Sequence, residues 1–74
     1  MREILDLVYM RDLVHRGMVK SIREAARLTQ EEVARDVGVH PSTVAHWEQG
    51  HVPGGEPAVR YASLLRELEE MQDA

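Results

Sequence analysis

The stretch QEEVARDVGVHPSTVAHWEQG, residues 30–50, contains two short helical patterns on either side of a glycine. Thr29, which precedes this stretch, and Glu32 have the spacing of a capping box. In a capping box the side chain of each residue accepts a hydrogen bond from the backbone N–H of the other. This spacing predicts that the first helix covers residues 30–37. Gly38 follows and supplies the positive φ that a tight turn needs. The pattern therefore predicts a capped helix that ends in a sharp turn.

The second helix of this stretch is predicted to begin at Pro41, because proline suits the first position of a helix. His40 is then its N-cap, and the helix ends near Gln49. Two helices joined by so short a turn cross at about 90–120°, which requires a small residue where they approach. Ala34 meets that need, and the inner faces hold Val33, Val37, Val39, Val44 and Trp47. Residues 30–50 are therefore predicted to form a helix-turn-helix.

Helical patterns on both sides extend this unit into an all-α fold. We predict an N-terminal extra helix in residues 1–17, a second helix over about residues 18–27, and a C-terminal helix within residues 56–71, where Pro57 suits the first helical position. The inner faces are predicted to hold Ile22, Ala25 and Ala26 in the second helix and Ala58, Tyr61, Ala62, Leu65 and Leu68 in the last. Because no stretch alternates with period two, we expect a compact bundle of about five helices in a single domain, residues 1–74.

Two features of the outer helices have more than one interpretation. Ser21 and Glu24 also have capping-box spacing, which gives the second helix an alternative, later start. The N-terminal helix is unusually apolar: Ile4, Leu5, Val8, Leu13 and Val14 fall near one face, and Leu7, Tyr9 and Met10 widen it. This surface either covers the small core or forms a dimer interface together with Leu64, Leu68 and Met71.

Composition excludes several classes of protein. The chain has 74 residues, of which 43% are hydrophobic and 30% charged, as expected of a folded domain with a thin core. It has no cysteine, so disulfides and thiolate zinc sites are excluded. No apolar run approaches the roughly 20 residues that a membrane span needs, and the N-terminal residues carry charges of both signs, unlike a signal peptide. We therefore expect a cytoplasmic protein of a bacterium or a phage-infected host cell, with no membrane partner.

The polar residues of the motif do not form a catalytic or metal-binding pattern. His40, His46 and His51 cannot all lie on one helix face, and no paired carboxylates support a metal site. Ser42 and His46 are spaced four residues apart like a nucleophile and its base, but no third residue or oxyanion donor accompanies them. We expect no enzyme activity, no metal ion and no cofactor.

The segments TQEEVA, VGV, STV and WEQG together resemble the Cro/C1-type helix-turn-helix family of phage repressors and bacterial regulators. The resemblance covers about residues 22–65. It implies a lambda-repressor-like fold and a small regulator that binds double-stranded DNA sequence-specifically, with the second helix of the motif in the major groove. It also implies a repressor that binds a pseudo-palindromic operator as a homodimer.

The resemblance assigns roles position by position. The base-reading residues would be His40, Pro41, Ser42, Ala45 and His46. The phosphate contacts would come from Thr29, Gln30, Thr43 and His51. Arg23 would pair with Glu48 to hold the recognition helix in place, and the other structural residues are Ala34, Gly38, Val44 and Trp47, the last in the core.

The charge of the chain departs from what this family implies. The net charge is −4, and residues 53–74 carry two positive and five negative charges, including the tail carboxylates Glu67, Glu69, Glu70 and Asp73. Pro41 has no donor for base reading, and the loop after the motif lacks lysine and arginine, so fewer phosphate contacts are expected and a monomer should bind weakly. The alternative function is an antitoxin or anti-regulator module that binds a second protein through the same scaffold.

Overall fold

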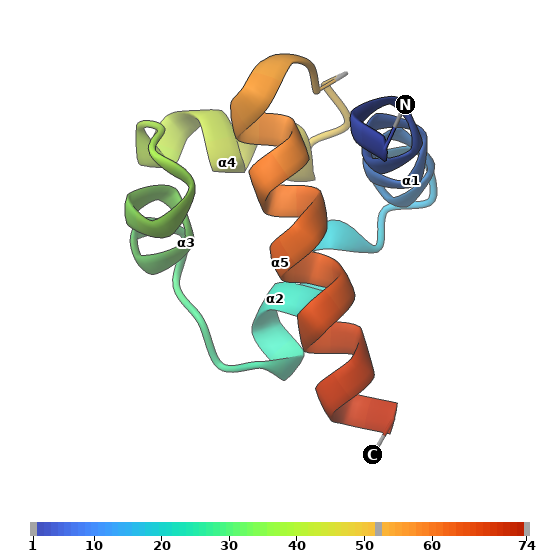
Figure 1. Cartoon of the computed structure of the whole chain (residues 1–74). Coiled ribbons are helices and arrows are strands. Elements are labelled where there is room, and N and C mark those ends of the chain that lie inside the picture. Colours follow the sequence, from blue (N-terminus) through green and yellow to red (C-terminus); the bar gives the residue numbers. More distant parts are fainter. Residues whose placement is uncertain (1, 52, 74) are drawn as a thin grey trace.

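The computed structural model describes residues 2–51 and 53–73, and over these residues it contains helices and no strands (Figure 1). The helices are α1 (Arg2–His15), α2 (Val19–Ala25), α3 (Gln30–Val37), α4 (Pro41–Glu48) and α5 (Gly55–Asp73). Met1, Val52 and Ala74 lie outside the described residues, as does the side chain of Asp73 in the acidic tail. The predicted all-α bundle of about five helices is confirmed. In the part of the chain described, no helix combines the length and apolar character needed to cross a membrane.

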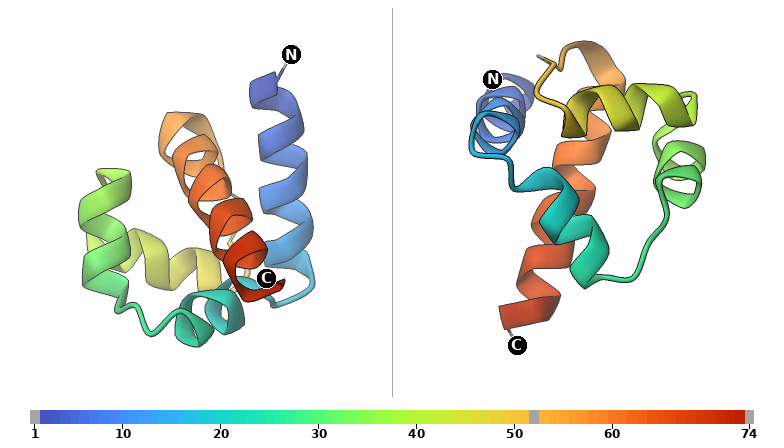
Figure 2. Two further views of the ribbon diagram at one scale, coloured as in Figure 1. Left: turned by 60° about the horizontal axis from the view of Figure 1, so that its bottom comes forward. Right: turned by 180° about the vertical axis from the view of Figure 1, so that it is seen from behind.

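The longest helix, α5, lies at the centre of the arrangement. It packs against α1, α2 and α3, while α4 packs against α3 and α2. Figure 1 shows α3 and α4 on one side of α5 and α1 on the other side. The view from behind in Figure 2 shows α4 crossing α5 near the N-terminal end of α5. The pair α3–α4 is therefore held away from α1 by the central helix.

The core fills the space between α5 and the other helices. Trp47 of α4 and Tyr61 of α5 meet there with ring centroids 5.6 Å apart. The buried apolar side chains are Met10, Leu13, Val14, Val19, Ile22, Val33, Ala34, Val37, Val44, Trp47, Ala58, Tyr61, Ala62, Leu65 and Leu68. The inward residues predicted for the last helix are all among them. The core fixes the position of α4, because Val44 and Trp47 of this helix are buried in it.

Local signals set the bounds of α3 correctly. The Glu32 backbone N–H donates to Thr29 Oγ1 at 3.0 Å, and the Thr29 N–H donates to Glu32 Oε1 at 2.9 Å, which is the predicted capping box. Gly38 then ends the helix with a φ of +87°. These interactions join residues close in sequence, so the local sequence is enough to predict them.

The bounds of α2 differ from the prediction. The helix begins at Val19 with Met18 as a cap that has no side-chain hydrogen bond, so the later start with Ser21 is wrong. It also ends at Ala25, two residues before the predicted end. Ala25, predicted to point inward, is exposed, whereas Val19, Ile22 and Arg23 form the buried side of the helix.

The start of α5 was also predicted too late. The helix begins at Gly55, so Pro57 is its third residue and not its first. The N–H groups of the whole first turn lack partners within the helix, so proline is tolerated throughout that turn. A proline therefore indicates the first turn of a helix but does not identify its first residue.

The apolar residues of α1 divide between two faces. Met10, Leu13 and Val14 are buried against the core, whereas Ile4, Leu5 and Val8 are 60%, 63% and 59% exposed. The prediction that Ile4, Leu5 and Val8 share one face with Leu13 and Val14 is therefore wrong, although part of the apolar surface does cover the core.

Polar contacts complete the attachment of α1 to α5. The Tyr9 hydroxyl donates to a carboxylate oxygen of Glu69. The guanidinium of Arg66 lies 4.2 Å from the centroid of the Tyr9 ring and 3.4 Å from Asp6 Oδ1. Burial, followed by the bond to Glu69, raises the pKa of Tyr9. Of the α5 residues considered for a dimer interface, Leu68 is buried in the core, Leu64 is partly buried, and Met71 is exposed.

Candidate nucleic-acid interface

The N-terminus of α4 is organised by His40. This residue has extended backbone dihedrals (φ −73°, ψ 146°), and its Nδ1 accepts a hydrogen bond from the Ser42 backbone N–H at 3.1 Å, as predicted for an N-cap. The same nitrogen lies 2.8 Å from Ser42 Oγ. Two residues predicted to read bases are therefore bound to each other, and His40 has Nε2 as its remaining nitrogen for another partner.

The two sides of α4 differ in exposure. Val44 is fully buried and Trp47 nearly so, which anchors the helix in the core. Ser42 and His46 are exposed, whereas Pro41, Thr43 and Ala45 are half-buried. The helix therefore presents small and polar side chains to the outside from a fixed position.

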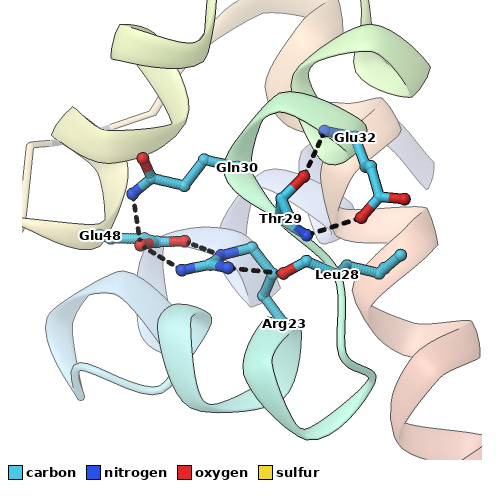
Figure 3. A network of polar contacts seen from close by, with 6 residues as sticks. All are labelled: Arg23, Leu28, Thr29, Gln30, Glu32 and Glu48. Atoms are coloured by element: carbon cyan, nitrogen blue, oxygen red, sulfur yellow. Dashed lines mark hydrogen bonds and ion pairs between the residues drawn. The ribbon is translucent and has the colours of Figure 1, made fainter.

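A buried ion pair joins α2 to α4 (Figure 3). Arg23 Nε donates to Glu48 Oε2 at 2.5 Å and Arg23 Nη2 to Glu48 Oε1 at 3.1 Å, while Nη1 donates to the Leu28 carbonyl at 2.6 Å. The two side chains are only 8% and 4% exposed. The hydrogen bond with Glu48 raises the pKa of Arg23. This arrangement holds the C-terminal end of α4 against the end of α2.

Gln30, the first residue of α3, belongs to the same network. Its Nε2 donates to Glu48 Oε1 at 3.0 Å, so the start of α3 is joined to the end of α4 (Figure 3). The side-chain carbonyl of Gln30 accepts no hydrogen bond within the described residues. Sequence reasoning missed the Gln30–Glu48 bond, because the two residues are 18 positions apart and neither carries a local signal for the other.

The turn between α3 and α4 has a second support that the sequence did not reveal. Arg60 of α5 donates from Nε to the Val37 carbonyl at 2.9 Å. The N–H groups of Gly38 and Val39 both donate to the Ala34 carbonyl, at 2.8 and 3.0 Å. A Cβ at Gly38 would lie 3.4 Å from Arg60 Nη2, in addition to the strain of its positive φ. The carbonyls of Ala34 and Val37 therefore both accept hydrogen bonds, and Arg60 attaches the turn to α5.

Beyond the end of α4, two predicted DNA-contacting histidines lie together. The rings of His46 and His51 stack with centroids 5.1 Å apart and an interplanar angle of 17°. The His51 backbone N–H donates to the His46 carbonyl at 3.1 Å, which keeps the loop close to the helix. Of the other predicted phosphate contacts, Thr29 uses its hydroxyl in the α3 cap, and Thr43 lies on the first turn of α4.

The helices α3 and α4 are short and are joined by a tight, hydrogen-bonded turn. The apolar side of α4 is buried in the core and its polar side is exposed. This arrangement defines a helix-turn-helix DNA-binding domain. A family model described as Helix-turn-helix matches residues 19–70, which is more than half of the chain. The chain therefore belongs to the helix-turn-helix family of Cro/C1 type, a family of DNA-binding regulators. The match begins at Val19, so α1 precedes it. No curated protein and no solved structure matches the chain.

Proposed function

We propose that this chain is a sequence-specific transcriptional repressor that binds a pseudo-palindromic operator as a homodimer. In this proposal α4 enters the major groove, and its base-reading residues are His40, Pro41, Ser42, Ala45 and His46. The phosphate contacts come from Thr29, Gln30, Thr43 and His51. Repression follows most simply from occlusion of a promoter by the bound domain.

The observation that carries this proposal is the fixed position of the exposed side of α4. Val44 and Trp47 secure the helix from within, and Glu48 joins its end to Arg23 and Gln30. Ser42 and His46 are exposed on a helix whose position is thereby set. Reading base edges requires such a rigid element, because a hydrogen bond to a base is lost when its donor or acceptor is misplaced by a small distance.

Dimerisation is proposed because one copy of the domain has a small electrostatic attraction to DNA. The net charge is −4, and each phosphate contact contributes to affinity through the release of counterions. Two copies bound to half-sites about 34 Å apart combine their contacts. Ile4, Leu5 and Val8 on the outer face of α1 provide exposed apolar surface of the kind that a symmetric dimer buries.

The test is selection of bound duplexes from a randomised DNA library with the purified chain at low salt. Enrichment of an inverted repeat is the expected result, and the spacing of its halves gives the dimer geometry. The control is a Ser42→Ala/His46→Ala variant, which keeps the buried side of α4. Selection with this variant should no longer enrich the wild-type sequence. Absence of enrichment with the folded wild-type chain contradicts sequence-specific reading.

A partner-binding module of the antitoxin or anti-regulator type is the second proposal. It is supported by the acidic balance of the chain and by the exposed apolar residues of α1. This function predicts DNA binding only after a second protein is added, or protein binding without any DNA. The same library selection, repeated with and without host-cell extract, separates the two functions.

A further inference from the structure

Helices α1 to α4 all end in the same backbone arrangement. Just past each helix one residue takes a positive φ: Gly17 (+68°), Arg27 (+61°), Gly38 (+87°) and Gly50 (+104°). In each case the N–H of the next residue donates to the carbonyl five positions earlier, at distances of 2.9, 3.2, 3.0 and 3.1 Å along the chain. Glycine is the ordinary residue at such a position, because it has no Cβ to clash. Three of these helices follow that rule, and α2 does not.

The left-handed φ of Arg27 ends α2, but among the described residues no hydrogen bond or ion pair of its side chain explains why this residue is arginine and not glycine. A side chain in the left-handed region costs free energy that glycine avoids, and such outliers cluster where function requires a particular residue. Arg27 is exposed. In residues 2–51 and 53–73 its guanidinium forms no hydrogen bond and no ion pair, whereas Arg23, within α2, is bound to Glu48.

Arg27 lines a groove that leads to the starts of α3 and α4. The groove has a volume of about 540 Å³, and its wall includes Arg27, Gln30 and Pro41. Two carboxylates, Glu24 and Glu31, also line it. Because Arg23 is neutralised by Glu48, Arg27 is the cation of this groove that has no partner in the described part of the chain. Without Arg27, the exposed charged residues of the groove wall would be the two carboxylates.

We propose that Arg27 binds a phosphate of the DNA backbone beside the segment read by α4. This assignment rests on the proposed DNA-binding function and adds a residue to it. Gln30 and Pro41 begin α3 and α4, so a DNA strand that passes these two helix starts also passes the groove. An arginine here attracts that strand where Glu24 and Glu31 would repel it, which accounts for a side chain at a position that favours glycine.

The test compares the wild-type chain with Arg27→Gly and Arg27→Lys, using the duplex enriched from the library and an unrelated duplex of equal length. The slope of log affinity against log salt is negative, and loss of one phosphate contact makes it less steep by about 0.9. We therefore expect Arg27→Gly to weaken binding to both duplexes, with a wild-type advantage that shrinks about 3.5-fold between about 50 and about 200 mM salt. Arg27→Lys should keep most of the slope. Arg27→Gly should melt at the same temperature as the wild type or higher, because glycine relieves the strain.

Two control variants separate a specific contact from a general effect of charge. Arg16→Gln makes the same charge change on the connection after α1, outside the groove, and should leave the slope unchanged. Glu24→Gln should tighten binding, a result that damage to the fold cannot produce. Wild-type affinity and slope for Arg27→Gly, or equal losses for Arg27→Gly and Arg16→Gln, would overturn this assignment alone. Failure of the wild-type chain to bind either duplex would overturn the proposed function and this assignment with it.

Discussion

Replacing Glu48 with alanine would leave the buried guanidinium of Arg23 without its carboxylate. Arg23 would keep its hydrogen bond to the Leu28 carbonyl, but Gln30 would also lose its partner. Removal of one member of a buried ion pair costs about 3–5 kcal/mol, because a charge stays buried without compensation. The lost hydrogen bond of Gln30 adds about 0.5–1.5 kcal/mol. The total is a large fraction of the roughly 4–11 kcal/mol expected for a domain of this length.

Thermal and urea denaturation followed by circular dichroism measure this loss. At about 4–8 °C per kcal/mol, Glu48→Ala should lower the Tm by at least about 12 °C. The matched control is Asp12→Ala, which breaks an exposed ion pair in which Arg16 Nη1 lies 3.1 Å from Asp12 Oδ2 and both side chains are 55% exposed. Exposed pairs of this spacing contribute only about 0.3–0.5 kcal/mol, so the control should barely change the Tm.

A second variant tests whether the unpaired charge causes the loss. Arg23→Met/Glu48→Leu removes both charges and fills the same space with apolar groups, so it should be clearly more stable than Glu48→Ala. A loss of stability for Glu48→Ala no larger than that for Asp12→Ala would contradict a stabilising role of the buried pair. A double variant as unstable as the single one would show that the loss comes from packing and not from the unpaired charge.

Four further substitutions test other parts of the structure. Gln30→Ala should weaken binding to unrelated duplexes by similar factors in a filter-binding assay, and a change of sequence preference would contradict a phosphate role. Ser42→Ala should alter the preferred base at particular operator positions when the library selection is repeated; an unchanged consensus removes it from the reading set. The Tyr61 hydroxyl is buried without a partner among the described residues, and burial raises its pKa, so Tyr61→Phe should raise the free energy of unfolding in urea by about 1 kcal/mol, whereas a decrease would indicate a partner. The Thr29 backbone N–H lowers the pKa of Glu32, so the stability that this carboxylate provides is present above its unfolded pKa and lost as pH falls through its folded value. Glu32→Gln should therefore lose less Tm than the wild type on acidification from about pH 6 to about pH 3, and equal losses would contradict the bond.

The two helices of the motif and the turn between them could be predicted from the amino-acid sequence, because their signals are local. Thr29 and Glu32 lie three residues apart, and Gly38 and Pro41 act on their own backbone, so these signals operate within one helical turn. The same locality explains why His40 was correctly predicted as an N-cap. The pairing of Arg23 with Glu48 was not visible in local signals and was expected only from resemblance to the family.

Features that depend on how distant helices pack against one another could not be predicted in this way. Helical periodicity places Ile4, Leu5 and Val8 on α1, but only the position of α5 determines that Met10 is covered and these three are exposed. The contacts of Gln30 with Glu48 and of Arg60 with Val37 join residues 18 and 23 positions apart. No local pattern specifies such pairs, because each partner is brought into place by the packing of other elements.

The end of α2 shows most clearly where prediction from the local sequence fails. The sequence predicted helix through residue 27, since nothing in the local pattern distinguishes Arg27 from a helical residue. The chain must turn away there so that α3 can pack against α5, and that requirement places Arg27 in the left-handed region. Local propensity describes the free energy of a segment alone, whereas its final conformation is the one that lets the whole core close.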